Sequence, residues 1–184
     1  MAALQDTESI NELLGDSSRK GIDLVVQLVG DNPVLFKQFL EITLREKGAL
    51  SQRASRVVNF ATLNHPGLFK PYAVEIVAKM PDMKHDSVKR EIIKTFADHD
   101  FDMDEVTTSK LLEICFKWFT DQNEKIAVQA YALDVLYKIS NQYPDLKFEL
   151  ISVIEQQREF MSTGMKARIA KMLPMLIKEI NLLT

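Results

Sequence analysis

The sequence predicts an all-α fold built from stacked helix pairs. Good helix formers (Leu, Ile, Lys, Glu, Ala and Met) dominate the 184 residues, and only six Gly and six Pro interrupt them. That number is low for an all-β protein with many tight turns. A hydrophobic fraction of 46% and a charged fraction of 27% are typical of a globular chain with an apolar interior.

An apolar position recurs along the chain with a period of about 38 residues. The anchors of this pattern are Leu50, Val88, Val128 and Met165, which are 38, 40 and 37 residues apart. Four residues after each anchor stands Ala or Ile, namely Ala54, Ile92, Ala132 and Ile169. Such a period indicates a stack of two-helix units, each of which buries its apolar face against its neighbours. We therefore expect a right-handed α-solenoid of about four to five helix pairs.

The chain divides into a short leading segment and five approximate units. Residues 1–16 are polar with one short apolar cluster, so we expect a flexible or frayed N-terminal segment there. A single repeat domain should then cover residues 17–184. Its approximate units are 17–48, 49–84, 85–120, 121–160 and 161–184.

The first two units show clear helix boundaries. Residues 16–18 can cap a helix whose apolar side runs from Ile22 to Val29, and Pro33 suits the first turn of the next helix. We expect that second helix to stop near Gly48. The second unit should hold helices over residues 50–63 and 68–80, separated by the helix-breaking run Asn64-His65-Pro66-Gly67.

The third unit should begin at Asp86, a plausible helix cap, and continue past an acidic loop at residues 98–105. Its second helix carries Cys115 and Trp118 on a stripe with helical spacing, which predicts core positions. In the fourth unit, residues 126–139 are apolar on almost every side. Such a helix must be covered on more than one face, as an inner helix of a stack would be.

The last unit should start a helix after Ser162-Thr163-Gly164. Pro174 lies within the apolar pattern of this helix. Because proline removes one backbone hydrogen bond, we expect it to kink the helix or shift its boundary.

Three tripeptides combine a small or β-branched apolar residue with Lys, Arg or Gln. These are Val88-Lys89-Arg90, Val128-Gln129-Ala130 and Met165-Lys166-Ala167. With this pattern the chain resembles HEAT or armadillo-type helical repeats over roughly residues 17–184, although few units carry the Asp-Val-Arg triplet of that family. The resemblance implies a curved solenoid that binds proteins, or occasionally nucleic acid, along one face.

Charge and cysteine content narrow the class of protein. A formal charge of −3 argues against a generic nucleic-acid binder, which usually needs a concentrated basic surface. The lone Cys115 excludes an intrachain disulfide and fits a reducing compartment. The start of the chain lacks the pattern of a secretory signal, and no run of 18 apolar residues exists. We expect a cytoplasmic protein without membrane contact.

The sequence lacks the motifs of metal and cofactor binding. Asp98, Asp100, Asp102 and Asp104 alternate as in a calcium loop, but the Gly and Glu that such a loop needs are replaced by Met103 and Ser109. The three histidines lie at different junctions without metal-site spacing, and no phosphate-binding glycine loop is present. We expect no catalytic residue, cofactor or metal, although a site made only of carboxylates would escape this reasoning.

Basic residues gather on the first helices of the units. If the units stack in register, they could form a stripe for an acidic partner, but solvation of exposed helix faces is the favoured interpretation. An exposed Phe116 could seed a binding patch, although aromatic residues at helical spacing are more often core. The candidate partner-binding residues are Arg53, Arg56, Lys89, Arg90, Lys94, Phe116, Lys166 and Arg168.

The sequence therefore predicts a non-catalytic scaffold or adaptor that binds a protein partner through a curved surface. The alternative is a nucleic-acid-binding protein related to the HEAT-like alkyl-purine DNA glycosylases. That resemblance would require an Asp with Trp and Arg near the lesion. Here Trp118 is followed by Asp121, but the nearby helix has Lys125 and no Arg. The identity of the partner and the oligomeric state stay open.

Overall fold

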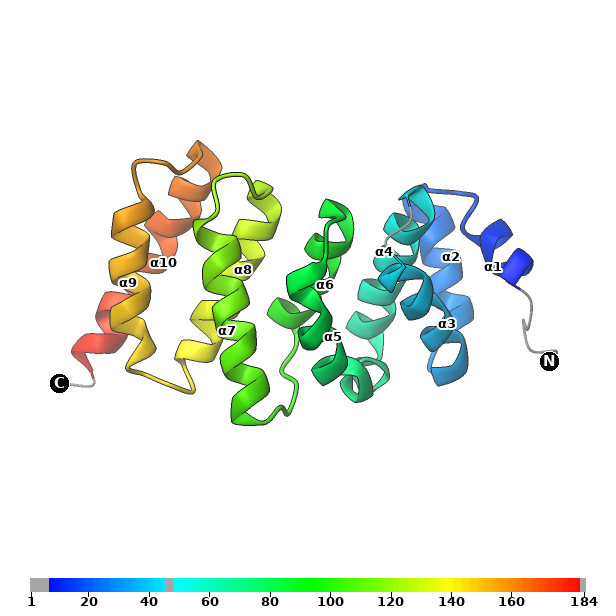
Figure 1. The fold of residues 1–184 in the computed structure, drawn as a ribbon, viewed down its shortest axis with the longest axis horizontal. Coiled ribbons are helices and arrows are strands. Elements are labelled where there is room, and N and C mark those ends of the chain that lie inside the picture. Colours follow the sequence, from blue (N-terminus) through cyan, green and yellow to red (C-terminus); the bar gives the residue numbers. More distant parts are fainter. Residues whose placement is uncertain (1–6, 46–47, 183–184) are drawn as a thin grey trace. The chain divides into compact units, whose positions relative to one another are not determined.

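The computed structural model describes residues 7–45 and 48–182, and all regular structure within them is helical (Figure 1). This confirms the predicted all-α fold. The chain divides into two compact units, Met1–Thr107 and Thr108–Thr184, which are described separately. The first part of the chain holds α1 (Thr7–Leu13), α2 (Arg19–Val29), α3 (Pro33–Leu44), α4 (Gly48–Asn64), α5 (Ala73–Lys79) and α6 (Asp86–Asp98). The second holds α7 (Glu105–Thr120), which begins just before the division, α8 (Ile126–Ser140), α9 (Leu146–Gln157) and α10 (Thr163–Asn181).

The helix α4 is the centre of the first unit, since it packs against α2, α3 and α6. Its buried face carries small and β-branched side chains, among them Ala54, Val57 and Ala61, all fully buried. Small side chains let neighbouring helices approach closely. The larger volume of the core comes from aromatic rings on the neighbours, such as Phe36 and Phe96.

The repeat positions lie where the periodicity places them. They fall on α4, α6, α8 and α10, which are alternate helices of the chain from α4 onward. The buried members are Ala54, Val88, Ile92, Val128, Ala132, Met165 and Ile169, whereas Leu50 is partly exposed. A repeat spacing in the sequence therefore corresponds to a repeated packing position.

Three predicted helix starts are confirmed by side-chain hydrogen bonds. Ser18 Oγ accepts from the Gly21 amide at 3.0 Å, and Ser162 Oγ accepts from the Met165 amide at 3.2 Å. Asn32 Oδ1 accepts from two amides at the start of α3, next to Pro33 in the first turn. Each bond satisfies an amide that has no partner within its helix.

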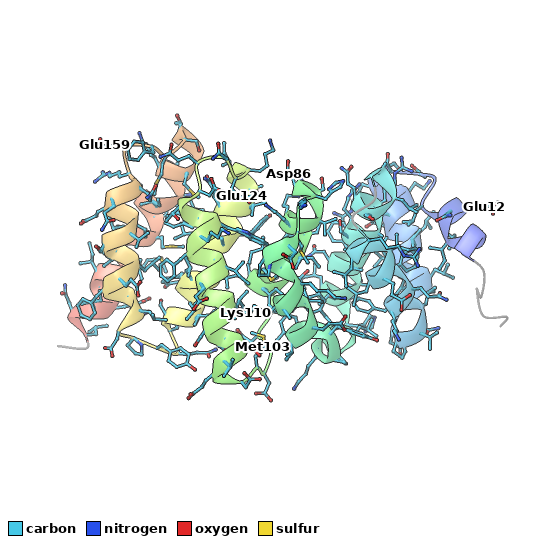
Figure 2. The ribbon with its side chains drawn as sticks, viewed as in Figure 1. Glu12, Asp86, Met103, Lys110, Glu124 and Glu159 are labelled. Atoms are coloured by element: carbon cyan, nitrogen blue, oxygen red, sulfur yellow. The ribbon has the colours of Figure 1, made fainter. Side chains whose placement is uncertain are left out.

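Two boundaries differ from the prediction, and a third position keeps one of its two expected effects. The helix α3 ends at Leu44, and Gly48 opens α4 instead of ending α3. Asp86 is the first residue of α6 (Figure 2), so the cap position one residue earlier belongs to His85. Pro174 lies inside α10, so it does not shift the boundary of that helix, and a kink stays a prediction.

The predicted helix over residues 68–80 is broken into shorter pieces. Two 3-10 turns, Pro66–Leu68 and Lys70–Tyr72, precede α5, and a third, Met80–Asp82, follows it. Each turn has a proline in its first two residues. Because proline lacks an amide hydrogen and clashes with the preceding turn, a continuous α-helix is interrupted here.

The N-terminal segment is partly helical. Within the expected frayed region 1–16, residues 7–13 form α1, and both Ile10 and Leu14 are buried. The rest of that region, residues 1–6, lies outside the described residues.

The second unit is built around α8, which contacts both α9 and α10. Its buried residues lie on one broad side of the helix: Val128, Ala132, Leu133, Val135, Leu136 and Ile139. Ile126, at the start of the stretch predicted to be covered on more than one face, is 54% exposed. On α7, Cys115 and Trp118 are buried, which confirms the predicted core stripe.

Candidate functional site

The predicted basic residues of α4 bind the chain's own backbone. Arg53 Nη1 donates to the carbonyl oxygens of Leu14 and Gly15, at 2.6 and 3.1 Å. Arg56 Nη1 donates to the carbonyl oxygen of Ser17 at 2.8 Å. These bonds attach the connection between α1 and α2 to α4, so both guanidinium groups have a structural task.

Lys94 belongs to a cluster that also contains Arg19 and Phe60, which we call the Phe60 cluster. The Arg19 guanidinium carbon lies 4.1 Å from the centre of the Phe60 ring, and Lys94 Nζ lies 5.5 Å from it. Cations over an aromatic face are attracted by the ring's quadrupole. Lys94 Nζ also donates to Asn59 Oδ1 at 2.9 Å and lies 3.4 Å from Asp98. The sequence prediction missed Phe60, although its spacing from Arg53 and Arg56 places it on their face of α4.

The remaining predicted residues divide between the two units. Arg90 pairs with the buried Glu91 at 2.7 Å, and Lys89 beside it is half-buried. In the second unit, Arg168 of α10 forms a bidentate ion pair with Asp134 of α8. Lys166 is exposed, whereas Phe116 is half-buried.

The acidic loop starts a helix and closes over aromatic rings. Asp104 Oδ1 accepts from the Thr107 amide at 2.7 Å, a bond that lowers the pKa of the Asp104 carboxyl. Asp102 lies 3.9 Å from Lys70, and Phe101 packs on Phe69. Within residues 7–45 and 48–182, no group of three or more His, Cys, Asp or Glu is placed to hold a metal. The acidic loop therefore has a structural role: it caps the start of α7 and packs Phe101 against Phe69.

Cys115 is unsuited to nucleophilic chemistry where it lies. The side chain is fully buried, and burial raises the pKa of its thiol far above the ordinary value. Because the thiolate is the reactive form, the native fold suppresses its reactivity.

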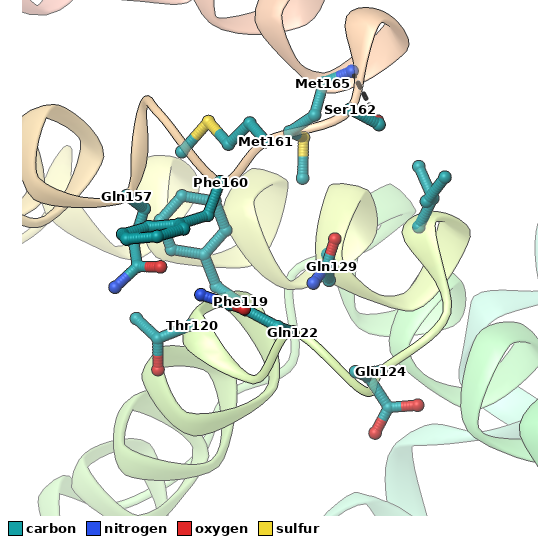
Figure 3. A pocket seen from close by; sticks show the side chains of 11 residues that line it. Phe119, Thr120, Gln122, Glu124, Gln129, Gln157, Phe160, Met161, Ser162 and Met165 are labelled. Carbon is teal, nitrogen blue, oxygen red and sulfur yellow. Dashed lines mark hydrogen bonds between the residues drawn. The ribbon is translucent and has the colours of Figure 1, made fainter.

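The second unit has a pocket of about 270 Å³ between the end of α7, the start of α8 and the connection from α9 to α10 (Figure 3). We call it the Phe160 pocket. Its apolar lining comes from Phe119, Ile126, Phe160, Met161 and Met165. Phe119 and Met165 are buried, whereas Phe160 is 65% exposed and Ile126 is 54% exposed. Large apolar side chains thus lie open to solvent at its mouth.

Uncharged polar groups share the lining of the Phe160 pocket. The amides come from Gln122, Gln129 and Gln157. Gln129 Nε2 donates to the carbonyl oxygen of Asp121 at 2.8 Å, which fixes that side chain across the turn from α7 to α8. Among the eleven residues drawn in Figure 3, Glu124 is the one ionisable side chain. The pocket can bury an apolar group and donate hydrogen bonds to its polar neighbours.

Sequence reasoning missed the Phe160 pocket. Phe160 and Ile126 are separated by 34 residues, and each stands next to a turn. A weak signal was available, because Phe160 follows a polar run that carries no helical apolar stripe.

Comparison with known protein families places the chain in one of them. A family model described as a HEAT repeat domain matches residues 9–176. No curated protein and no solved structure gives a significant match to the chain. Among the described residues, no helix has the length and apolar character needed to cross a membrane.

Proposed function

Since the chain belongs to the HEAT repeat family, we propose that this helical-repeat scaffold binds a protein partner through the Phe160 pocket and performs no catalysis. The observation that carries the proposal is the exposure of Phe160 and Ile126 around an apolar hollow. Exposed large apolar side chains that surround a concavity are typical of interaction sites.

The energetics favour a partner that covers these side chains. Burying a side chain of this size contributes about 1.5–3 kcal/mol relative to leaving it in water. A partner residue that enters the pocket would contact the buried Phe119 and Met165 as well. The amides of Gln122 and Gln157 would then satisfy polar groups of the partner's backbone, which gives the contact a direction.

The composition of the pocket supports binding over chemistry. General acid–base catalysis requires a titratable group at the reacting bond, and most hydrolytic mechanisms use at least two. Glu124 is the one ionisable residue among the eleven that line this pocket. The site is therefore better suited to recognition.

Affinity capture with paired variants tests the proposal. The tagged wild-type protein, Phe160→Asp and Leu24→Asp would each be incubated with lysate of the source cells, with and without nuclease. Leu24 is a matched control, because it is an exposed apolar residue of the first unit. We expect the wild type and Leu24→Asp to recover a partner protein both with and without nuclease. Phe160→Asp should not recover that protein. Equal recovery by Phe160→Asp would remove the pocket from the interaction.

The nuclease treatment also tests the nucleic-acid alternative. Arg53, Arg56 and Arg168 are engaged by carbonyl or carboxylate oxygens of the chain, which reduces their capacity to bind phosphates. Recovery that disappears with nuclease would favour nucleic acid as the partner. The proposal places the scaffold in the cytoplasm, where the lone Cys115 would stay reduced.

A further inference from the structure

A second hollow lies on the second unit between α8 and α10. This groove has a volume of about 480 Å³, and we call it the α8–α10 groove. One wall carries Asp134 and Tyr137 of α8, and the other carries Ala167, Lys171 and Met175 of α10. Met175 is 50% exposed. The groove thus offers apolar and small side chains next to a cationic one.

The groove wall on α10 continues as a stripe along the helix. Arg168, Lys171, Met175 and Lys178 follow one another at spacings of three and four residues. Residues at these spacings lie on one face of an α-helix. Three cations therefore line the side of α10 that borders the groove, and Lys171 and Lys178 make no ion pair within the described part of the chain.

The charge of α10 is unbalanced on its outer surface. The helix carries Lys166, Arg168, Lys171 and Lys178 against a single acid, Glu179. That carboxylate is already engaged: Lys147 Nζ donates to it at 2.7 Å and the Tyr137 hydroxyl donates to it at 2.7 Å. An incoming anion would consequently meet Lys171 and Lys178 without competition from Glu179, whereas Arg168 is already paired with Asp134.

We infer that the α8–α10 groove binds an acidic amphipathic helix of a partner protein. Acidic residues of that helix pair with Lys171 and Lys178, while its apolar residues cover Met175 and Ala167. A helix presents such residues at spacings of three and four, which match the stripe on α10. This surface differs from the Phe160 pocket, so either proposal can fail while the other stands.

The shape of the site favours a helix over a membrane. A basic helix with exposed apolar side chains could also lie on an anionic bilayer. The apolar residues here lie in a hollow between two helices, however, and a flat bilayer surface does not fill such a hollow. The convex surface of a helix can fill it. Binding of a helical peptide and binding of anionic vesicles can be measured separately.

The test measures fluorescence anisotropy of a labelled peptide with the full chain. The peptide is an amphipathic helix of about 15 residues, roughly 22 Å long, with Glu and Leu on one face and Ala elsewhere. Its counterpart carries Lys in place of Glu. The protein variants are Lys171→Glu and its matched control Lys166→Glu, the same charge reversal at an exposed position of α10 that does not line the groove. Circular dichroism checks that both variants remain helical.

We expect the Glu peptide to bind the wild type and Lys166→Glu with equal affinity. Its affinity for Lys171→Glu should be lower by a factor of about ten. Phe160→Asp should leave this affinity unchanged. The inference is overturned if the wild type does not bind the Glu peptide, if the Lys peptide binds equally well, or if both charge reversals weaken binding alike. It is also overturned if the wild type binds phosphatidylserine vesicles, but not the peptide, in a manner that requires Lys171.

Discussion

Lys147 Nζ of α9 donates a hydrogen bond to Glu179 Oε2 of α10 across 2.7 Å, and 5% of the Lys147 side chain is exposed. The Tyr137 hydroxyl of α8 donates to the other carboxylate oxygen of Glu179, also at 2.7 Å. One carboxylate thus joins three helices of the second unit. Since two of these helices, α8 and α10, also form the α8–α10 groove, the network helps to position its walls.

Breaking this network from the lysine side should destabilise the second unit. Lys147→Met removes the donor to Asn141 and the cation beside Glu179, which keeps only the hydrogen bond from Tyr137. We expect a loss of about 1–3 kcal/mol in the free energy of unfolding, less than for a fully buried pair because Glu179 is one-third exposed. Urea denaturation measures it. As a control, Lys79→Met breaks an exposed pair with Glu75 and should cost less than about 0.5 kcal/mol.

The same network predicts a dependence of stability on pH. The hydrogen bonds from Lys147 and then Tyr137 lower the pKa of Glu179 below its ordinary value of 4.5. The stability that Glu179 contributes is therefore present above pH 4.5 and is lost as the pH falls through the lowered pKa. The difference in unfolding free energy between the wild type and Glu179→Gln should shrink as the buffer is taken below pH 4.5. A difference that stays constant on acidification would contradict the assignment.

Tyr137 predicts a loss of stability at alkaline pH, whereas Glu179 predicts one at acidic pH. Burial, together with the hydrogen bond and negative charge of Glu179, raises the pKa of Tyr137 from 10.0 to about 12. A raised pKa means that the protonated hydroxyl stabilises the fold below pH 10.0, and that this contribution is lost as the pH rises towards 12. Ultraviolet titration of phenolate, compared between the wild type and Tyr137→Phe, should show one tyrosine that ionises late. An early transition for every tyrosine would argue against the hydrogen bond to Glu179.

Asn59 should couple α4 to α6. Its Nδ2 donates to Thr95 Oγ1 at 2.9 Å, and its Oδ1 accepts from Lys94 Nζ at 2.9 Å. Because the amide is buried, Asn59→Ala should cost about 1–3 kcal/mol. Asn64→Ala, at the exposed end of the same helix, serves as the control and should change the unfolding free energy little. Equal effects of the two substitutions would show that the bridge contributes nothing.

Two aromatic residues of the Phe160 pocket should differ in how much they contribute to stability. Phe160 is 65% exposed, so Phe160→Ala should leave the thermal midpoint almost unchanged. Phe119 is buried in the floor of the same pocket, and Phe119→Ala should cost about 3–5 kcal/mol. Differential scanning calorimetry of both variants checks this contrast. A large loss from Phe160→Ala would show that this ring supports the fold and would weaken its proposed role in recognition.

The helical fold was predictable because its signals are local. The spacing of Val88, Val128 and Met165 reports which side of each of these helices is buried, because each repeat buries the same position. Ser18 and Ser162 mark helix starts through hydrogen bonds to amides three residues away, a distance that the sequence states directly. Errors appeared where two local signals competed, as at the prolines that divide the expected helix over residues 68–80.

The sequence by itself determined the class of fold, the family pattern and the buried stripe of each helix, since these depend on residues within a few turns of one another. Tertiary structure decided what each charged or aromatic side chain does. Arg53 is a candidate partner-binding residue in the sequence, and only the structure shows that its guanidinium donates to carbonyl oxygens 38 and 39 residues away. Lys147 and Glu179 are 32 residues apart and meet because α9 and α10 pack together. Phe160 and Ile126 flank one pocket for the same reason: packing brings distant residues together, and no local spacing records which of them will meet.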